Sequence, residues 1–459
     1  MAKSLKSAVS TAPAPWRRPK SGRPLVPTQG EALSRSTQFL FLIFVAYTAC
    51  PIIEVPGLDL SLSALILLFI AIEIFLSGSL GWVQQYSRWI ILAGFFWLGI
   101  LLSLVGNIFL GEGAAIDLDN WKQVLRFAYW MVAFVTTIYV VSTARLGPRV
   151  VKAITWAILV TALCRWGEAL FFGKVGAWTT GGLFTMSQNS YAILFSTYAP
   201  CLLVPLLSRE GRRWPAIMAA LVVWGAVVIN GSRSSWIAVS LGICVFMGLY
   251  AVAQPARMHR LLPLILLPVV LGGLLMLAPQ VYTEKVAERF DTFQHLDQDK
   301  SYNIRKLMIQ KGWRMFLDSP LFGAGAGNFT KEMVKLDLDE VTRYGSQKHF
   351  NKKSSHNSYI ALLAETGLAG CLPFGILLLL LVVKGCKAAM ILSRQEEIWA
   401  LGIYVGFLMM SLHLWALAGL TNTGPWVMYG LVAALILTAR EDGDNMQTIP
   451  QSVGRQAKK

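Results

Sequence analysis

The sequence predicts an all-α polytopic membrane protein with about twelve transmembrane helices and one long loop between the ninth and tenth spans. Two observations predict this fold class. First, 55% of the 459 residues are hydrophobic and only 14% are charged, whereas soluble proteins carry about 25% charged residues. Second, largely apolar runs of about 20 residues, the length that crosses a bilayer, recur along the chain. We expect spans near residues 37–55, 60–77, 89–110, 123–143, 149–171, 188–208, 214–230, 233–252, 260–278, 359–384, 398–418 and 421–440.

Basic residues in the short loops predict how these spans are oriented. With a cytoplasmic N-terminus, the cytoplasmic side holds most of the Lys and Arg residues of the short connections, as the positive-inside rule requires. The same arrangement accounts for much of the net charge of +16 as orientation signals facing an anionic leaflet, so we expect no nucleic-acid partner. The cytoplasmic set is Arg88, Arg145, Arg149, Lys152, Arg209, Arg212, Arg213, Arg257, Arg260, Lys384, Lys387 and Arg394.

This orientation divides the chain into five parts. Both termini are predicted to be cytoplasmic, and the one long connection is predicted to lie outside. A polar segment of about 80 residues between apolar spans is typical of a functional loop. The parts are a basic tail (1–36), spans one to nine (37–278), an outer loop with an amphipathic helix (279–358), spans ten to twelve (359–440) and a second tail (441–459).

The cysteine and aspartate residues indicate no metal site. All six cysteines fall in or beside apolar runs, with no CxxC spacing, and we interpret them as packing residues. Asp297 and Asp299 have the spacing of a DxD metal motif, but alone in a polar loop they are better explained as solvated charge. We therefore expect neither a metal nor a cofactor.

The first motif on the outer face is the segment NGSRSSW at residues 230–236. The break at 230–233 predicts a tight turn between spans seven and eight. It puts Arg233 between two apolar runs, next to hydroxyl groups and the start of a helix. Arginine offers a permanent charge and a donor fork suited to diphosphate oxygens, and a helix N-terminus favours the same anion. An interfacial arginine that contacts lipid headgroups is the alternative.

The second motif begins at Arg305 in the outer loop. Residues 302–317 place apolar side chains against basic ones at helical spacing, which predicts a helix lying in the interface with its apolar side toward the bilayer. The segment PLFGAGAGNF follows at 320–329. Its glycines lack the spacing and the preceding strand of a dinucleotide site. A tight turn that lets its backbone approach a neighbouring segment explains them better.

The third motif is SSHNSYIALLAETG at residues 354–367, where the outer loop meets the tenth span. A partly shielded histidine such as His356 can be neutral and can accept a proton from a hydroxyl group. A helix cap or a surface histidine is the alternative. Glu365 lies nine residues further on, on the opposite face of an unbroken helix, so we do not expect it to pair with His356. The segment around Thr366 and Gly367 should loosen the helix.

Several polar residues within the spans have simpler explanations. Arg165 and Glu168 are spaced to pair on one helix face. They, like Glu73 and Arg126, fall near predicted span ends, where charged side chains can reach the interface. His413, near the outer end of the eleventh span, could line the same cavity as the motifs, but we expect a packed histidine.

Together, the segments GSRSSW, PLFGAGAGNF after Arg305, and HNSYIALLAETG resemble the O-antigen ligase and O-antigen polymerase superfamily, over about residues 180–385. The resemblance implies a C-type glycosyltransferase fold in the bacterial inner membrane, with the long loop in the periplasm. It also implies transfer of a glycan from undecaprenyl diphosphate to an acceptor hydroxyl group, without a metal or a nucleotide sugar. On this resemblance, His356 matches the general base, and Arg233 and Arg305 match the arginines that hold the diphosphate.

The chain departs from the family in two places. The family often has a tryptophan four residues after the loop arginine, where this chain has Ile309. An arginine commonly leads the glycine-to-asparagine segment before the sixth span, but residues 178–180 here are Trp-Thr-Thr. Lys174 or Arg165 is the nearest replacement for that charge, and we assign Lys174 to the diphosphate site.

The predicted reaction inverts the anomeric carbon, because the acceptor hydroxyl group attacks it directly. Arginines stabilise the departing diphosphate, and the histidine removes the proton of the attacking hydroxyl group. The expected partners are the undecaprenyl-diphosphate-linked glycan, membrane lipids, and a lipid A core sugar as the acceptor, which would make the protein an O-antigen ligase. A polymerase of O-antigen or exopolysaccharide, a protein O-oligosaccharyltransferase, and a non-catalytic transporter of lipid-linked glycans are the alternatives.

Overall fold

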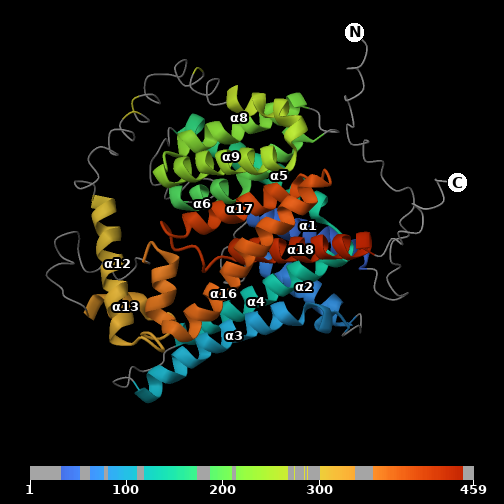
Figure 1. Ribbon diagram of the computed structural model, residues 1–459. Coiled ribbons are helices and arrows are strands. Elements are labelled where there is room, and N and C mark those ends of the chain that lie inside the picture. The colour runs from blue at the N-terminus through green and yellow to red at the C-terminus, as the bar shows by residue number, and fades with distance from the viewer. Residues whose placement is uncertain are drawn as a thin grey trace, which may run out of the picture. The chain divides into compact units, whose positions relative to one another are not determined.

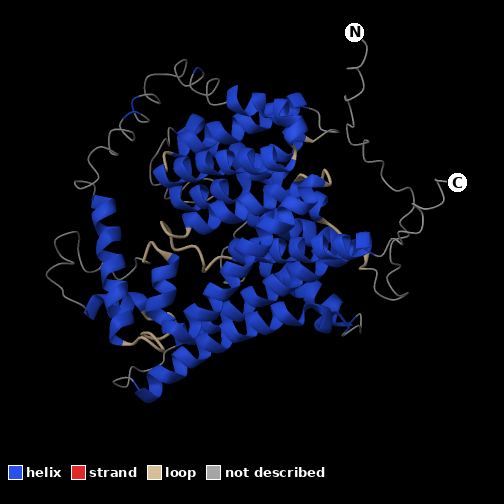
Figure 2. Cartoon of the chain, in the orientation of Figure 1, coloured by secondary structure: helices blue, strands red, loops and turns tan. Residues whose placement is uncertain are grey.

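The computed structural model describes residues 33–51, 62–76, 81–110, 118–172, 187–208, 213–266, 300–335 and 355–447, together with residues 273, 284 and 287. Within these ranges every regular element is a helix (Figure 2). The N-terminal half contains α1 (Arg35–Ala49), α2 (Leu62–Leu76), α3 (Gly81–Leu110), α4 (Leu118–Ala144), α5 (Gly147–Phe172), α6 (Gln188–Tyr198), η1 (Ala199–Leu202), α7 (Leu203–Leu207) and α8 (Arg213–Asn230). The C-terminal half contains α9 (Arg233–Ala253), η2 (Pro255–Leu261), α12 (Lys300–Asp318), α13 (Phe329–Lys335), α16 (Ser358–Arg394), α17 (Trp399–His413) and α18 (Thr423–Gln447).

Seven stretches in the described part of the chain are long enough and apolar enough to cross a membrane, and α2 and α17 are shorter apolar helices. Large apolar side chains remain exposed on the outward faces of the helices, as they do where lipid replaces water. Examples are Phe75, Phe95, Phe171 and Trp214, which are 57–81% exposed. The protein is therefore a polytopic membrane protein, as predicted.

Helices coincide with eleven of the expected spans. The expected ninth span, 260–278, and both tails fall mostly outside the described residues, as do residues 288–299 and 336–354 of the loop from 279 to 358. The total of twelve spans therefore stays a prediction. The sixth span is not a continuous α-helix, because the 3-10 turn η1, which contains Pro200, lies between α6 and α7.

A cluster of aromatic rings holds α3, α4, α16 and α18 together. Trp426 of α18 is fully buried and lies parallel to Trp130 of α4, with ring centroids 6.5 Å apart. Phe96 of α3 stacks on the same indole at 5.4 Å, and Phe374 of α16 meets it edge-on at 6.1 Å. Aromatic pairs at these separations add to the gain from burying their area.

Helix α16 is interrupted at Gly367, whose backbone is left-handed with φ +56°. The interruption leaves backbone groups on both sides without partners inside the helix. The turn at residues 320–325 supplies those partners, at 2.8–3.0 Å. The N–H groups of Ala324 and Gly325 donate to the carbonyls of Ala364 and Glu365, and those of Leu368 and Ala369 donate to the carbonyls of Pro320 and Leu321.

The glycine run therefore works as the sequence predicts, as a turn that approaches a neighbouring backbone. Gly323 has φ +66°, and a Cβ atom there would lie 2.5 Å from the carbonyl carbon of Glu365. Side chains of α3 fix the contact, since Ser103 donates to the Glu365 carbonyl at 2.7 Å and Asn107 donates to the Gly323 carbonyl at 2.9 Å. Figure 1 shows α12 and α13 beside the first part of α16, where this contact holds them.

Candidate functional site

His356 lies in a short turn directly before α16, and its neighbours fix its backbone. Asn357 caps the helix, because its side-chain oxygen accepts the N–H groups of Tyr359 and Ile360 at 3.0 Å. Ser355 donates its hydroxyl to the Asn357 carbonyl at 2.7 Å. Between them His356 takes the left-handed conformation, with φ +51°, which is uncommon for a residue with a side chain. Ser355 and Asn357 are buried, whereas the His356 side chain remains partly exposed.

The turn is attached to the chain that follows α17. The Ser358 N–H donates to the Leu414 carbonyl at 2.9 Å. The Ser358 hydroxyl donates to the Leu417 carbonyl at 2.7 Å and accepts the N–H groups of Gly419 and Leu420 at 2.9 and 3.2 Å. The polar residues of the third motif therefore fix the position of the backbone that carries His356.

Arg233 is the first residue of α9, directly after the tight turn that the sequence predicts. The turn uses Gly231 in the left-handed conformation, with φ +67°. The side chain of Asn230 donates to the Gln188 carbonyl at 3.0 Å, and the side chain of Gln188 donates to the Asn230 carbonyl at 2.7 Å. This reciprocal pair ties the turn to the start of α6. The Ser232 and Ser234 hydroxyls, on either side of Arg233, lie 3.0 Å apart.

Arg305 lies on α12, which confirms the helix predicted for residues 302–317. The prediction that its apolar side faces the bilayer is wrong in part. Ile304 and Met308 are buried in a cluster with residues of α13 and α16, whereas Trp313 is 49% exposed. The helix therefore packs mainly against protein, because α16 and the turn before α13 provide an apolar surface that the sequence of α12 does not reveal. The buried cluster is Ile304, Met308, Met315, Phe329, Met333 and Ala364.

The three motifs meet at the end of α17, around His413. The Nε2 atom of His413 is 3.5 Å from the hydroxyl of Ser234, the residue after Arg233. The guanidinium of Arg305 is near enough to interact electrostatically with the same imidazole. The next residue, Leu414, accepts the Ser358 N–H, two positions beyond His356. Segments that are far apart in sequence thus meet around His413, for which the sequence predicts only a packing role.

Glu365 belongs to the scaffold of this region. Its carboxylate accepts the Phe329 N–H at 3.1 Å, at the start of α13. It is thus bonded to the segment that follows the glycine turn. Residues 364–367 of the third motif and the glycine run are hydrogen-bonded to each other through their backbones.

The fourth predicted site residue, Lys174, lies outside the described residues. Arg165, the other candidate for the missing cation, is buried and only 1% exposed. It pairs with Glu168 at 3.1 Å, and the Tyr191 hydroxyl donates to the same carboxylate at 3.2 Å. The prediction that these residues can pair is confirmed, but the suggestion that they reach the interface is wrong, because α6 covers them. Arg165 is therefore not placed to contact a ligand at the membrane surface.

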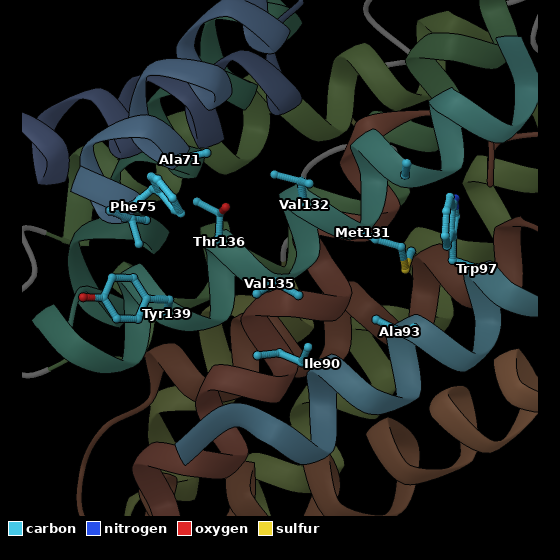
Figure 3. Close-up of a pocket in the computed structure, with 13 residues that line it drawn as sticks. Ala71, Phe75, Ile90, Ala93, Trp97, Met131, Val132, Val135, Thr136 and Tyr139 are labelled. Carbon is cyan, nitrogen blue, oxygen red and sulfur yellow. The ribbon is translucent and has the colours of Figure 1, made fainter. Parts of the chain in front are cut away.

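A cavity of about 470 Å³ lies among α2, α3 and α4 (Figure 3). Trp97, Met131 and Phe75 are among its lining residues, and almost all the lining side chains are apolar. It contains none of the motif residues, so it is separate from the polar cluster at the end of α17. An apolar cavity of this kind suits a hydrocarbon chain. In the described part of the chain, no group of three His, Cys, Asp or Glu residues is arranged to hold a metal ion.

Comparison with known proteins adds an independent finding. No curated protein matches the chain. One protein-family model does, and the matched stretch contains Arg233, Arg305 and His356 but neither Lys174 nor His413. The members of that family are ligases and polymerases that transfer glycosyl groups. Over residues 217–375 the chain matches the family model described as O-Antigen ligase (Wzy_C), which confirms the resemblance found in the motifs.

Proposed function

We propose that this protein is an O-antigen ligase-type glycosyltransferase. It moves a glycan from undecaprenyl diphosphate to a hydroxyl group of a lipid A core sugar, at the periplasmic face of the bacterial inner membrane. The observation that carries this proposal is the meeting of three motif segments at the end of α17. The backbone that follows the partly exposed His356 is bonded to Leu414, and Arg305 is within electrostatic reach of His413. The family match over residues 217–375 supports the same class of reaction.

The roles follow from the chemistry of each side chain. His356 is the general base, because an imidazole that remains accessible in a fixed turn can take the proton of an acceptor hydroxyl group. Arg233 and Arg305 bind the diphosphate and stabilise the charge that develops as it leaves. Lys174 is a further diphosphate contact in this proposal. Because the hydroxyl group attacks the anomeric carbon directly, the configuration inverts, and these steps require no metal or cofactor.

The topology belongs to the same proposal. A C-type glycosyltransferase arrangement of about twelve spans puts residues 1–36 and 441–459 in the cytoplasm. Residues 279–358 then form the periplasmic loop that contains α12 and α13. The start of α9, the start of α16 and the end of α17 all fall on the periplasmic side, which is where a lipid-linked glycan would meet its acceptor.

The experiment combines purified protein with an undecaprenyl-diphosphate glycan and either lipid A core or a second carrier-linked glycan as the acceptor, with EDTA present. We expect transfer to the lipid A core. His356→Ala should lower kcat by about 100-fold or more, since general-base catalysis contributes about 10²–10⁴-fold. Arg233→Gln and Arg305→Gln should raise the donor KM and lower kcat.

His259→Ala is the matched control, because His259 is exposed in η2, on the side predicted to be cytoplasmic. It should transfer like the wild type. Full activity in His356→Ala would remove the assigned base. Transfer only to the second carrier-linked glycan would identify a polymerase instead of a ligase. Movement of the glycan lipid across vesicle bilayers, with transfer to neither acceptor, would overturn the enzyme assignment.

A further inference from the structure

His413 is a buried polar residue at the centre of the proposed site. It is the last residue of α17 and is only 2% exposed. Its Nδ1 atom is 2.9 Å from the Ser196 hydroxyl of α6, and its Nε2 atom is 3.5 Å from the Ser234 hydroxyl of α9. A buried imidazole is costly unless its nitrogens find partners, and here the partners come from two other helices.

The hydrogen bonds around Ser196 fix which ring nitrogen carries the proton. The Ser196 hydroxyl has one proton, and it donates this proton to the Ala192 carbonyl at 2.7 Å. Ser196 can therefore only accept from the imidazole, so Nδ1 is the protonated nitrogen of His413. In a neutral ring the other nitrogen is then an acceptor. Nε2 thus presents its lone pair to the Ser234 hydroxyl.

A neutral ring with this tautomer suits its surroundings. The guanidinium of Arg305 is within electrostatic reach of His413, so a second positive charge on the imidazole would repel it. A neutral ring has no such penalty. The ring also joins the start of α9, which carries Arg233, to the end of α17, where Leu414 holds the His356 turn.

We propose that His413 is a positioning residue for binding of the donor diphosphate. Its neutral imidazole, fixed by Ser196, uses Nε2 to hold Ser234, and through Ser234 it sets the direction of Arg233. This inference rests on the proposed function, in which these two arginines bind a lipid diphosphate. His413 is not the base itself, because a side chain this buried cannot reach an acceptor sugar, whereas His356 remains partly exposed.

The test uses substitutions of His413 that keep the contact of one ring nitrogen and remove that of the other. In His413→Gln the side-chain oxygen can occupy the place of Nε2 and accept from Ser234. In His413→Asn the amide can replace Nδ1 and donate to Ser196, but nothing reaches Ser234. His413→Phe fills the volume and keeps neither contact. His259→Asn is the matched control on the opposite side of the protein.

The primary measurement is the Kd for undecaprenyl diphosphate in nanodiscs, with Tm measured in parallel. We expect His413→Asn and His413→Phe to weaken binding about tenfold, which corresponds to one hydrogen bond of ordinary net strength. His413→Gln should bind within about threefold of the wild type. In the transfer assay the same loss should fall on the donor KM, with the acceptor KM unchanged. Ser234→Ala should weaken binding by a similar factor and add little to His413→Asn, because both remove one contact.

Three results would overturn the inference. One is unchanged diphosphate binding in His413→Phe, which would leave a packing role alone. Another is binding in His413→Gln that is as weak as in His413→Asn. The third is a wild-type protein that does not bind undecaprenyl diphosphate. If the wild type binds the lipid but transfers no glycan, the proposed function fails, and the order of the variants in binding still decides the role of His413.

Discussion

The carboxylate of Glu365 accepts a hydrogen bond from the backbone N–H of Phe329 at 3.1 Å, across 36 residues of sequence. This bond satisfies a donor at the start of α13, next to the turn that fills the break in α16. Glu365→Leu removes the acceptor and should lower the stability of the folded protein by about 1–3 kcal/mol, the usual cost of an unsatisfied buried donor. Glu365→Gln keeps an acceptor oxygen and should lose less. Thermal unfolding in detergent measures both, and equal Tm values for the two variants would contradict this role.

The two left-handed glycines of the backbone contact should not tolerate a side chain. Gly367→Ala and Gly323→Ala each force a Cβ atom to within about 2.5 Å of backbone atoms in the opposite segment. The conformation alone costs an L-residue about 1–2 kcal/mol, so both variants should unfold at lower temperature and lose transfer activity. Gly375→Ala is the control within α16, since a Cβ atom there meets nothing within 4 Å. It should keep or raise the Tm.

The Ser358 hydroxyl should matter more than that of another buried serine in the same helix. Ser358 makes three hydrogen bonds that hold the His356 turn on residues 417–420. Ser358→Ala leaves those backbone groups without their partner, so it should cost about 1–3 kcal/mol and reduce kcat. The Ser393 hydroxyl is buried and makes no hydrogen bond, so Ser393→Ala should change neither quantity. A kcat for Ser358→Ala equal to that of Ser393→Ala would show that the turn does not position the base.

The buried pair of Arg165 and Glu168 should show strong coupling. Arg165→Met alone leaves a carboxylate buried beside Tyr191, and loss of one partner of such a pair costs about 3–5 kcal/mol. The double variant Arg165→Met/Glu168→Gln removes both charges, so it should be more stable than Arg165→Met. Lys122 and Asp119 form an exposed pair at 3.2 Å, and Lys122→Met should change stability by less than about 1 kcal/mol. Tm values for the wild type, Arg165→Met, Glu168→Gln and the double variant form a double-mutant cycle, in which additive effects would contradict the coupling.

Much of the fold could be predicted because backbone groups in lipid must be hydrogen-bonded within the protein, which restricts spanning segments of this composition to helices. Length and hydropathy located the helices, and the break at 230–233 located the turn before Arg233. The loosening at Gly367 was visible as well, since glycine permits a left-handed residue. The contact that this break makes could not be predicted, because the backbone groups it frees pair with residues 320–325. Local sequence does not show which distant segment supplies such partners.

The candidate site shows the same limit. Arg233, Arg305 and His356 were identified from local motifs, each with its own charge or helix terminus. At His413 the sequence predicts a packed histidine, since a lone histidine in an apolar run is usually packed. Its significance comes from Ser196 and Ser234, each more than 170 residues away in sequence. The buried face of α12 was missed for a related reason, because its partners lie on α13 and α16.

The break in α16 also bears on the order in which the chain is made. A membrane helix with unpaired backbone groups at its interruption would insert at a cost of several kcal/mol per group. Residues 320–325, which supply the partners, precede Gly367 in the chain and leave the ribosome before it. Residues 320–325 are therefore already synthesised when the interrupted helix arrives, so the helix can be completed as it enters the bilayer. A circular permutation that moved 320–325 behind α16 would reverse this order and leave the freed groups exposed during insertion.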